Sequence, residues 1–208
     1  MVIVSGPQVL PPPAFPQGPP ELYSPGALFS WPELQALALD GVLVQLYQRG
    51  YLPPGTSPTP RLRARAAAIL VSPAIRQRVV AGRMTAAWIY GCAAEPDRLA
   101  LLIDANRRIS SLRSTRGCTF HEVRLGPFDV VSLGGLLVTS PLRTCVDLAL
   151  HVDSARAVPA LRALLDTPEL GLRLRLLIRA VEATPRVPHK TLALAKLESL
   201  QAGPAPPG

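Results

Sequence analysis

Cysteine is scarce in this chain of 208 residues, and its pattern argues against two kinds of site. The three cysteines, Cys92, Cys118 and Cys145, lie far apart and have neither C-x-x-C spacing nor closely spaced histidines. A disulfide framework needs paired cysteines, and a structural zinc site needs clustered ligands. We therefore expect three buried thiols that act as small apolar side chains, and no bound metal or cofactor.

Long uncharged apolar runs are also missing. Residues 1–20 contain no cationic n-region, and prolines at position 7 and at positions 11–13 interrupt their apolar stretch. That composition argues against a secretory signal. No later run reaches the roughly 18 apolar residues that a membrane span requires. These absences predict a cytoplasmic protein without a membrane partner.

Lysine is nearly absent, because only Lys190 and Lys196 are lysines among 22 cationic residues. Residues 1–48 contain no Lys or Arg and three acidic residues, so the net charge of +8 for the whole chain becomes +11 for the rest of it. Codon bias in a GC-rich genome explains the arginine excess as well as function does. The functional alternative is a nucleic acid or an acidic protein partner, since guanidinium groups suit phosphates and carboxylates.

Proline-rich segments mark both ends of the chain. We expect residues 1–23 and 202–208 to be disordered or extended, because proline removes backbone donors that helices and sheets need. Between these tails, a small unit over residues 24–58 precedes a larger domain over residues 59–201.

Helix starts are predicted where Ser or Thr precedes proline, because the hydroxyl caps free N–H groups while proline presets φ. The four such pairs are Thr59-Pro60, Ser72-Pro73, Ser140-Pro141 and Thr167-Pro168. A further helix opens at Ser30, where Ser30 and Glu33 have capping-box spacing, and it stops at Asp40-Gly41. Residues 84–90 and 190–201 also have helical spacing.

Strands are predicted from period-two alternation over residues 42–47 and from β-rich runs over 98–104, 118–124 and 130–138. Gly134-Gly135 splits the last run into a hairpin. The pattern predicts an α+β fold, a small antiparallel sheet with flanking helices.

Groups that could perform catalysis do not converge in the sequence. His121 and Glu122 are adjacent on a strand and so point to opposite faces. Glycine-rich phosphate loops are absent. A restriction-type nuclease needs a lysine near an acidic pair on adjacent strand positions, whereas both lysines here lie in the last helical segment. We predict that the chain is not an enzyme, and the alternative is a degenerate nuclease or other enzyme that uses Asp97 or Asp104.

Arginines gather in two places. Arg61, Arg63 and Arg65 open the helix after residue 59, and Arg61 and Arg65 share a face. This face is either a solvated surface or a set of phosphate contacts beside a β wing. A second group, in a connection between two strands where it could reach a partner, consists of Arg107, Arg108, Arg113 and Arg116.

Three segments resemble motifs of actinobacterial AbiEi-family antitoxins: Arg83–Gly91, Gly134–Ala149 and Pro185–Lys190. The likeness runs from about residue 29 to residue 200, and the second segment is its most specific part. Members of that family combine an N-terminal winged helix-turn-helix with a C-terminal antitoxin domain.

The resemblance implies an antitoxin that neutralises a cognate nucleotidyltransferase-fold toxin and represses its own operon by binding promoter DNA. The winged helix is reduced here, since one helix over residues 30–39 precedes a wing-like region over 42–51. A DNA-binding regulator without a toxin partner is the other alternative. The second arginine group is the candidate toxin contact, and the candidate DNA contacts are Gln45, Gln48, Arg49, Tyr51, Arg61 and Arg65.

Overall fold

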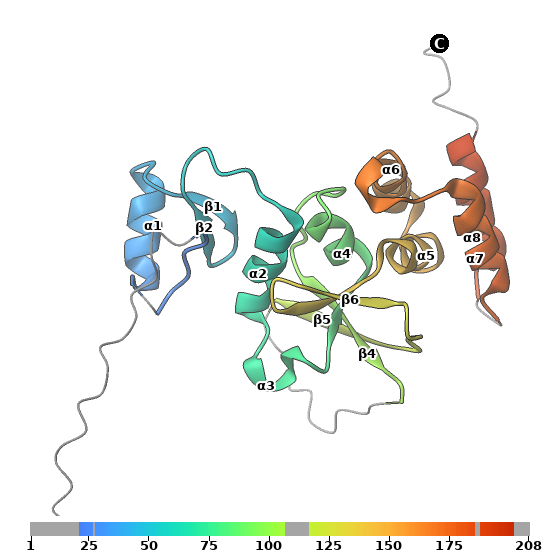
Figure 1. The fold of residues 1–208 in the computed structure, drawn as a ribbon, viewed down its shortest axis with the longest axis horizontal. Helices are drawn as coiled ribbons and strands as arrows, with labels where there is room; N and C mark the ends of the chain where they lie inside the picture. Colours follow the sequence, from blue (N-terminus) through green and yellow to red (C-terminus); the bar gives the residue numbers. More distant parts are fainter. Residues whose placement is uncertain (1–20, 27, 107–116, 186–187, 202–208) are drawn as a thin grey trace, which may run out of the picture.

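The computed structural model describes residues 21–26, 28–106, 117–185 and 188–201, which begin with one helix and a hairpin (Figure 1). Helix α1 spans Trp31–Leu39, and the Ser30 backbone N–H donates to Glu33 Oε2 at 2.7 Å, as the capping-box spacing predicts. Strands β1 (Val44–Tyr47) and β2 (Gly50–Leu52) pair antiparallel. The wing-like region is therefore a short hairpin.

The residues just before α1 belong to the fold, although the tail prediction included them. Leu22 is 8% exposed in the main core, and Tyr23 exchanges two backbone hydrogen bonds with Tyr51, at 2.8 and 2.9 Å. Apolar Leu22 and aromatic Tyr23 offer burial that the preceding prolines lack. The remainder of the tail predictions, over residues 1–20 and 202–208, lies outside the described residues.

The central sheet has five strands in the order β5-β4-β3-β7-β6. Their bounds are β3 Val80–Ala81, β4 Leu99–Asp104, β5 Cys118–Val123, β6 Val130–Leu133 and β7 Leu136–Thr139. The β3/β4 and β6/β7 pairs are antiparallel, whereas β4/β5 and β3/β7 are parallel. The α+β class is confirmed, but the sheet is mixed and not antiparallel, because β4/β5 and β3/β7 are parallel. The central strand β3 was not predicted, since two residues are too few to show a period.

The remaining helices are α2 Pro60–Leu70, α3 Pro73–Arg76, α4 Arg83–Ile89, α5 Pro141–His151, α6 Ser154–Leu165, α7 Leu174–Ala183 and α8 Lys190–Gln201. The Ser/Thr-Pro signal marks helix starts at α2, α3 and α5. At Thr167-Pro168 the prediction is wrong, because only a 3₁₀ turn (Pro168–Leu170) forms before Gly171 adopts a φ of 61°. Helix α6 was not predicted, and it contains Pro159 in its interior.

Helix α5 is the hub of the helical side of the molecule, since it packs against α4, α6, α7 and α8 (Figure 1). Trp88 of α4 is buried in the main core, and the Tyr47 ring lies 4.7 Å from it, between ring centroids. The Tyr47 hydroxyl donates to Pro96 O at 2.9 Å. The hairpin is therefore anchored to the body. No helix in the described ranges is long and apolar enough to span a membrane.

Candidate functional site

Two of the three segments that carry the resemblance form one packed unit. Arg83–Gly91 builds α4, and Gly134–Ala149 builds the end of the β6–β7 hairpin and most of α5. The Tyr90 hydroxyl donates to Thr139 O at 2.7 Å, and the hydroxyls of Thr139 and Thr144 lie 2.7 Å apart. Both threonines are buried, so these bonds fix the start of α5 against the end of α4.

A cavity of about 640 Å³ has lining residues from each of the three segments, and we refer to it as the motif cavity. Arg83 comes from the first segment, Arg143 and Asp147 come from the second, and Pro185 comes from the third. The β5–β6 connection contributes Phe128, whose side chain is 89% exposed at the rim. Residues more than 100 positions apart in sequence thus share one site.

Arg143 holds two carboxylates inside the motif cavity. Its Nη1 donates to Asp129 Oδ2 at 2.6 Å, and its Nε donates to Asp147 Oδ1 at 2.9 Å. Asp147 is only 1% exposed, and its Oδ2 has no hydrogen-bond partner among the described residues. Burial raises the pKa of Asp147, while the Arg143 charge and hydrogen bond oppose that rise. One oxygen of Asp147 is therefore buried without a hydrogen-bond donor from the described residues.

Arg83 is held in an unusual backbone conformation at the wall of the motif cavity. Its φ is 53°, a left-handed value that is uncommon for a residue with a side chain. Its Nη1 donates to His121 Nε2 at 3.3 Å, and its buried Nε has no partner in the described part of the chain. Burial and the neighbouring Arg83 charge both lower the pKa of His121, which favours the neutral ring as acceptor.

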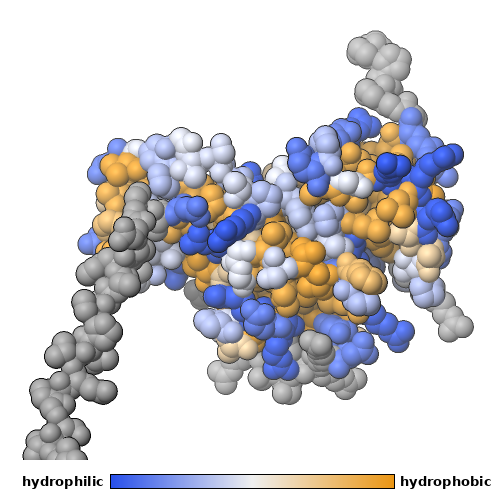
Figure 2. Space-filling model, in the orientation of Figure 1, coloured by the Kyte–Doolittle hydropathy of each residue, from blue (hydrophilic) through white to orange (hydrophobic). Residues whose placement is uncertain are grey.

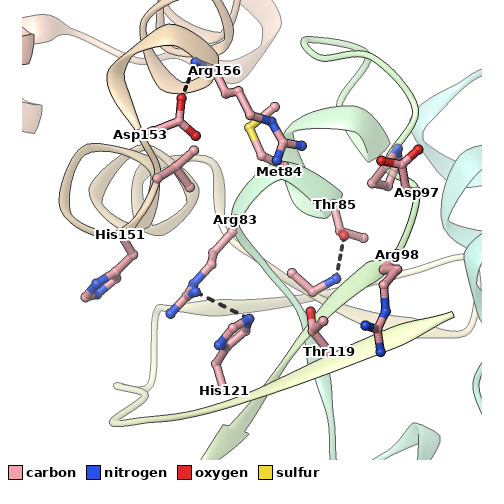
Figure 3. A pocket seen from close by; sticks show the side chains of 13 residues that line it. Arg83, Met84, Thr85, Asp97, Arg98, Thr119, His121, His151, Asp153 and Arg156 are labelled. Carbon is pink, nitrogen blue, oxygen red and sulfur yellow. Dashed lines mark hydrogen bonds between the residues drawn. The ribbon is translucent and has the colours of Figure 1, made fainter. Parts of the chain in front are cut away.

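A second cavity of about 350 Å³ lies on the other side of Arg83, and we refer to it as the arginine cavity. Figure 3 shows Arg83, Arg98 and Arg156 around it, with Thr119 and His121 on the strand side. Arg98 Nη2 donates to Cys118 O at 2.8 Å. Arg83 and His151 line both cavities, so the two hollows are neighbours.

The carboxylates considered for an enzyme do not come together. Asp97 precedes β4 and lines the arginine cavity, whereas Asp104 ends β4, where its Oδ1 accepts from the Asn106 backbone N–H at 3.1 Å. Asp97 and Asp104 therefore lie at opposite ends of β4. Among the described residues, no group of three His, Cys, Asp or Glu is placed to hold a metal ion.

Of the hairpin residues predicted to contact DNA, three are exposed and one is buried. Gln45, Gln48 and Arg49 are exposed, and the Gln45 side-chain amide donates to Gln48 O. The Arg49 guanidinium lies 5.3 Å from the centroid of the Trp31 ring. Tyr51 is 1% exposed and packs in the small core, so it is wrong as a DNA contact. Its face of the strand is the one that α1 covers.

The two arginines of α2 that were predicted to contact DNA also differ in their surroundings. Arg61 is exposed, whereas Arg65 Nη1 lies 3.3 Å from Glu21 Oε2. The hairpin tip lies between them, since a Cβ added at Gly134 would be 2.5 Å from Arg61 O and 2.8 Å from Arg65 Cγ. The four arginines predicted to contact a toxin lie outside the described residues: Arg107, Arg108, Arg113 and Arg116.

The motif cavity was not among the predicted sites, although its main ion pair has a local signal. Arg143 and Asp147 are four residues apart in a helix, which places them on one face. The contributions of Arg83, His121 and Asp129 depend on tertiary packing, and nothing local in the sequence indicates them.

No protein-family model and no curated protein matches the chain. A solved structure, that of the Rv2827c protein from Mycobacterium tuberculosis, is similar with a TM-score of 0.43 and 18% sequence identity. The match covers 85% of this chain and 70% of that chain. At this TM-score and identity the likeness has no bearing on function.

Proposed function

We propose that the chain is an antitoxin of the AbiEi type, which binds and neutralises a nucleotidyltransferase-fold toxin. One observation carries this proposal: each of the three separate segments on which the resemblance rests contributes at least one residue to the lining of a single cavity, Arg83 from the first, Arg143 and Asp147 among others from the second, and Pro185 from the third. A likeness confined to core packing would leave those segments without a common solvent-facing site. Their convergence supports a shared binding role.

The character of the motif cavity suits a protein partner better than a reaction. Its rim bears Phe128, and exposed aromatic side chains are frequent anchors of protein interfaces. The ionic groups inside it, Arg143 with Asp129 and Asp147, are engaged with one another at 2.6 and 2.9 Å. The His121 ring accepts from Arg83, which leaves its Nε2 unsuited to serve as a general base.

Co-expression with the product of the neighbouring gene, which the proposal requires to be a nucleotidyltransferase-fold toxin, tests the proposal. We expect the tagged toxin to copurify with the chain and growth to be restored. Phe128→Ala should weaken the complex by about tenfold or more, as loss of an aromatic anchor does. Leu39→Ala is the matched control, because Leu39 is equally exposed, at 88%, but lies at the end of α1.

Failure of the wild-type chain to copurify with the toxin and to restore growth would remove the antitoxin assignment. A complex that tolerates Phe128→Ala but not Leu39→Ala would move the binding site to the N-terminal unit.

A second function, binding of promoter DNA, is supported by the exposure of Gln48 and Arg49 in the hairpin and of Arg61 at the start of α2. Arg61 is the better phosphate contact of the two helix arginines, because Arg65 already pairs with Glu21. Sequence-specific reading would come from Gln45 and Gln48, whose amides suit base edges.

A mobility-shift titration of the chain's own promoter fragment tests this second function. Arg49→Ala combined with Arg61→Ala should reduce the dependence of log affinity on log salt by about two units, because two phosphate contacts are lost. Arg156→Ala, an exposed arginine of α6, is the control and should leave the slope unchanged. An unchanged affinity and slope in the double variant would refute this DNA surface.

A further inference from the structure

The arginine cavity is lined by positively charged groups that have no carboxylate partner. Arg83, Arg98 and Arg156 line it, and none of them forms an ion pair with a carboxylate in the described part of the chain. Asp97 and Asp153 share the lining, so two negative charges stand against three positive ones. An excess of unpaired guanidinium groups around one hollow favours an anion as its occupant.

Strand β5 holds two of these arginines in place. Arg83 Nη1 donates to His121 Nε2 at 3.3 Å. Arg98 Nη2 donates to Cys118 O at 2.8 Å. Cys118 and His121 are three residues apart on β5, which is roughly 10 Å along a strand. Figure 3 shows the two guanidinium groups on either side of Thr119, which lies between them on the strand. Both groups are therefore spaced and fixed before a ligand binds, which favours binding.

We propose that the arginine cavity binds the phosphate group of a small molecule, which lies between the guanidinium groups of Arg83 and Arg98. Two charge-assisted hydrogen bonds of about 2.8 Å, with a phosphate between them, span most of the distance between the two arginines. The inference does not rest on the proposed function, because no part of it depends on a toxin.

Solvent reaches the two arginines that make this site. Arg98 is exposed, and Arg83 is half-buried. Arg83 Nε is buried, so its contact with a ligand comes from the Nη groups. A guanidinium has several N–H donors, and the contact with β5 engages one nitrogen of each arginine. The Thr119 hydroxyl already donates to Leu99 O at 3.3 Å, so the arginines supply the donors for the anion.

The arrangement of the two arginines favours a phosphate over a carboxylate. A carboxylate presents both of its oxygens to one side, which suits a bidentate pair with a single guanidinium. A phosphate is tetrahedral, so guanidinium groups on two sides of a hollow each meet an oxygen. A phosphate monoester also approaches two negative charges at neutral pH, which matches two arginines.

The remainder of the cavity limits the molecule that carries the phosphate. The volume of about 350 Å³ lies near the lower end for small-molecule sites, and Met84, Pro96 and Val152 add apolar surface. Among the described residues, this lining contains no Phe, Tyr or Trp on which a nucleobase would stack. A sugar phosphate therefore suits the cavity better than a nucleotide does.

Nuclear magnetic resonance of the full chain, observed at its three histidine rings, tests the site. His121 contacts Arg83, whereas His189 lines neither cavity and serves as the internal reference. The His121 signal is identified by its loss in His121→Gln. It is followed at constant pH and ionic strength during titration with inorganic phosphate, ribose 5-phosphate and acetate.

We expect a saturable shift of the His121 signal with both phosphates, binding of acetate that is at least tenfold weaker, and an unmoved His189 signal. Tighter binding of ribose 5-phosphate than of inorganic phosphate would identify a phosphate monoester as the ligand, and the reverse order would identify free phosphate.

Two variants that lose the same charge make the result decisive. Arg98→Ala should weaken phosphate binding at least tenfold, because one of the two charged donors is lost. Arg98 is exposed, so this change removes no buried side chain. Arg175→Ala is the matched control, because Arg175 is an exposed arginine of α7 outside this lining, and it should leave phosphate binding unchanged.

A shift of the His121 signal that is absent, does not saturate or is equal with acetate would overturn the inference. So would equal phosphate affinities of Arg98→Ala and Arg175→Ala. Phosphate binding without toxin copurification would overturn only the proposed function, and copurification without phosphate binding would overturn only this inference.

Discussion

The N-terminal unit and the body of the molecule differ in how their apolar residues are used. In the N-terminal unit, α1 and the β1–β2 hairpin bury one small cluster of Leu34, Leu43 and Tyr51. Among the described residues, the same unit holds five of the eight exposed large apolar side chains: Leu28, Trp31, Leu39, Val42 and Val44. Figure 2 shows this apolar surface over α1. The body instead buries a continuous core around Trp88 and α5.

From this difference we infer that the N-terminal unit depends on the body for its stability. Its hairpin contributes Tyr47 and Leu52 to the main core, while Leu43 and Tyr51 face α1. A cluster of three buried residues is too small to fold alone. We therefore expect the body to set the stability of the whole chain and the N-terminal unit to loosen first.

The largest expected effect is that of Trp88→Ala. The change removes a buried indole whose ring centroid lies 4.7 Å from that of Tyr47. The Arg63 guanidinium carbon lies over the same indole, 5.7 Å from its centroid. It should lower the free energy of unfolding by about 3–5 kcal/mol. Tyr51→Ala should instead release protection of backbone amides over residues 31–52, with little change in the main urea transition. Equal losses of unfolding free energy in Trp88→Ala and Tyr51→Ala would show that the two regions form one core.

Gly134→Ala tests how the body packs against α2. The added methyl would meet Arg61 O at 2.5 Å, and φ at this position is +54°, so we expect a loss of about 3 kcal/mol. The neighbouring Gly135→Ala is a matched control, because φ is +81° but nothing lies within 4 Å of the added atom. Its loss should be about 1 kcal/mol. Similar thermal midpoints in the two variants would contradict the contact between hairpin and helix.

Tyr47→Phe weakens the link between the two regions by a single hydrogen bond. Removal of the hydroxyl leaves Pro96 O without its donor at 2.9 Å and should cost about 1 kcal/mol. Tyr90→Phe removes a comparable bond, to Thr139 O at 2.7 Å, inside the body. Hydrogen exchange should become faster in the hairpin for the first variant only. Faster hairpin exchange in both would mean that the anchor is not local.

The smallest expected effect is a pH dependence that belongs to the body. The pKa of His121 is lowered, first by burial and then by the Arg83 charge, so the folded state favours the neutral ring. This contribution to stability is present above the ordinary value of 6.5 and is lost as pH falls toward the lowered pKa. His121→Gln should flatten the fall in unfolding free energy between about pH 6.5 and 5. Parallel curves of unfolding free energy against pH for His121→Gln and wild type would contradict this role of His121.

Local signals in the sequence predict local structure well. Thr59 accepts from the Leu62 backbone N–H at 3.2 Å, and Ser140 caps α5 as expected. Gly134-Gly135 turns the hairpin where the sequence places it. These features depend on a few adjacent residues, so the sequence contains them in full.

Features that depend on tertiary packing could not be predicted. Strand β3 has two residues, and only its neighbours β4 and β7 make it a strand. The burial of Tyr51 follows from the position of α1, which period-two spacing does not specify. The motif cavity joins Arg83 to Asp147 across α4 and α5, so its lining becomes visible only in three dimensions.

The proposed function requires that a protein partner bind at the motif cavity of the body and not at the apolar surface of the N-terminal unit. Hydrogen exchange of the full chain, alone and with the proposed toxin, tests this requirement most directly. We predict slower exchange at the cavity rim, over residues 122–130, 141–147 and 180–185, with residues 31–52 unchanged. Slower exchange confined to residues 31–52 would contradict binding at the motif cavity.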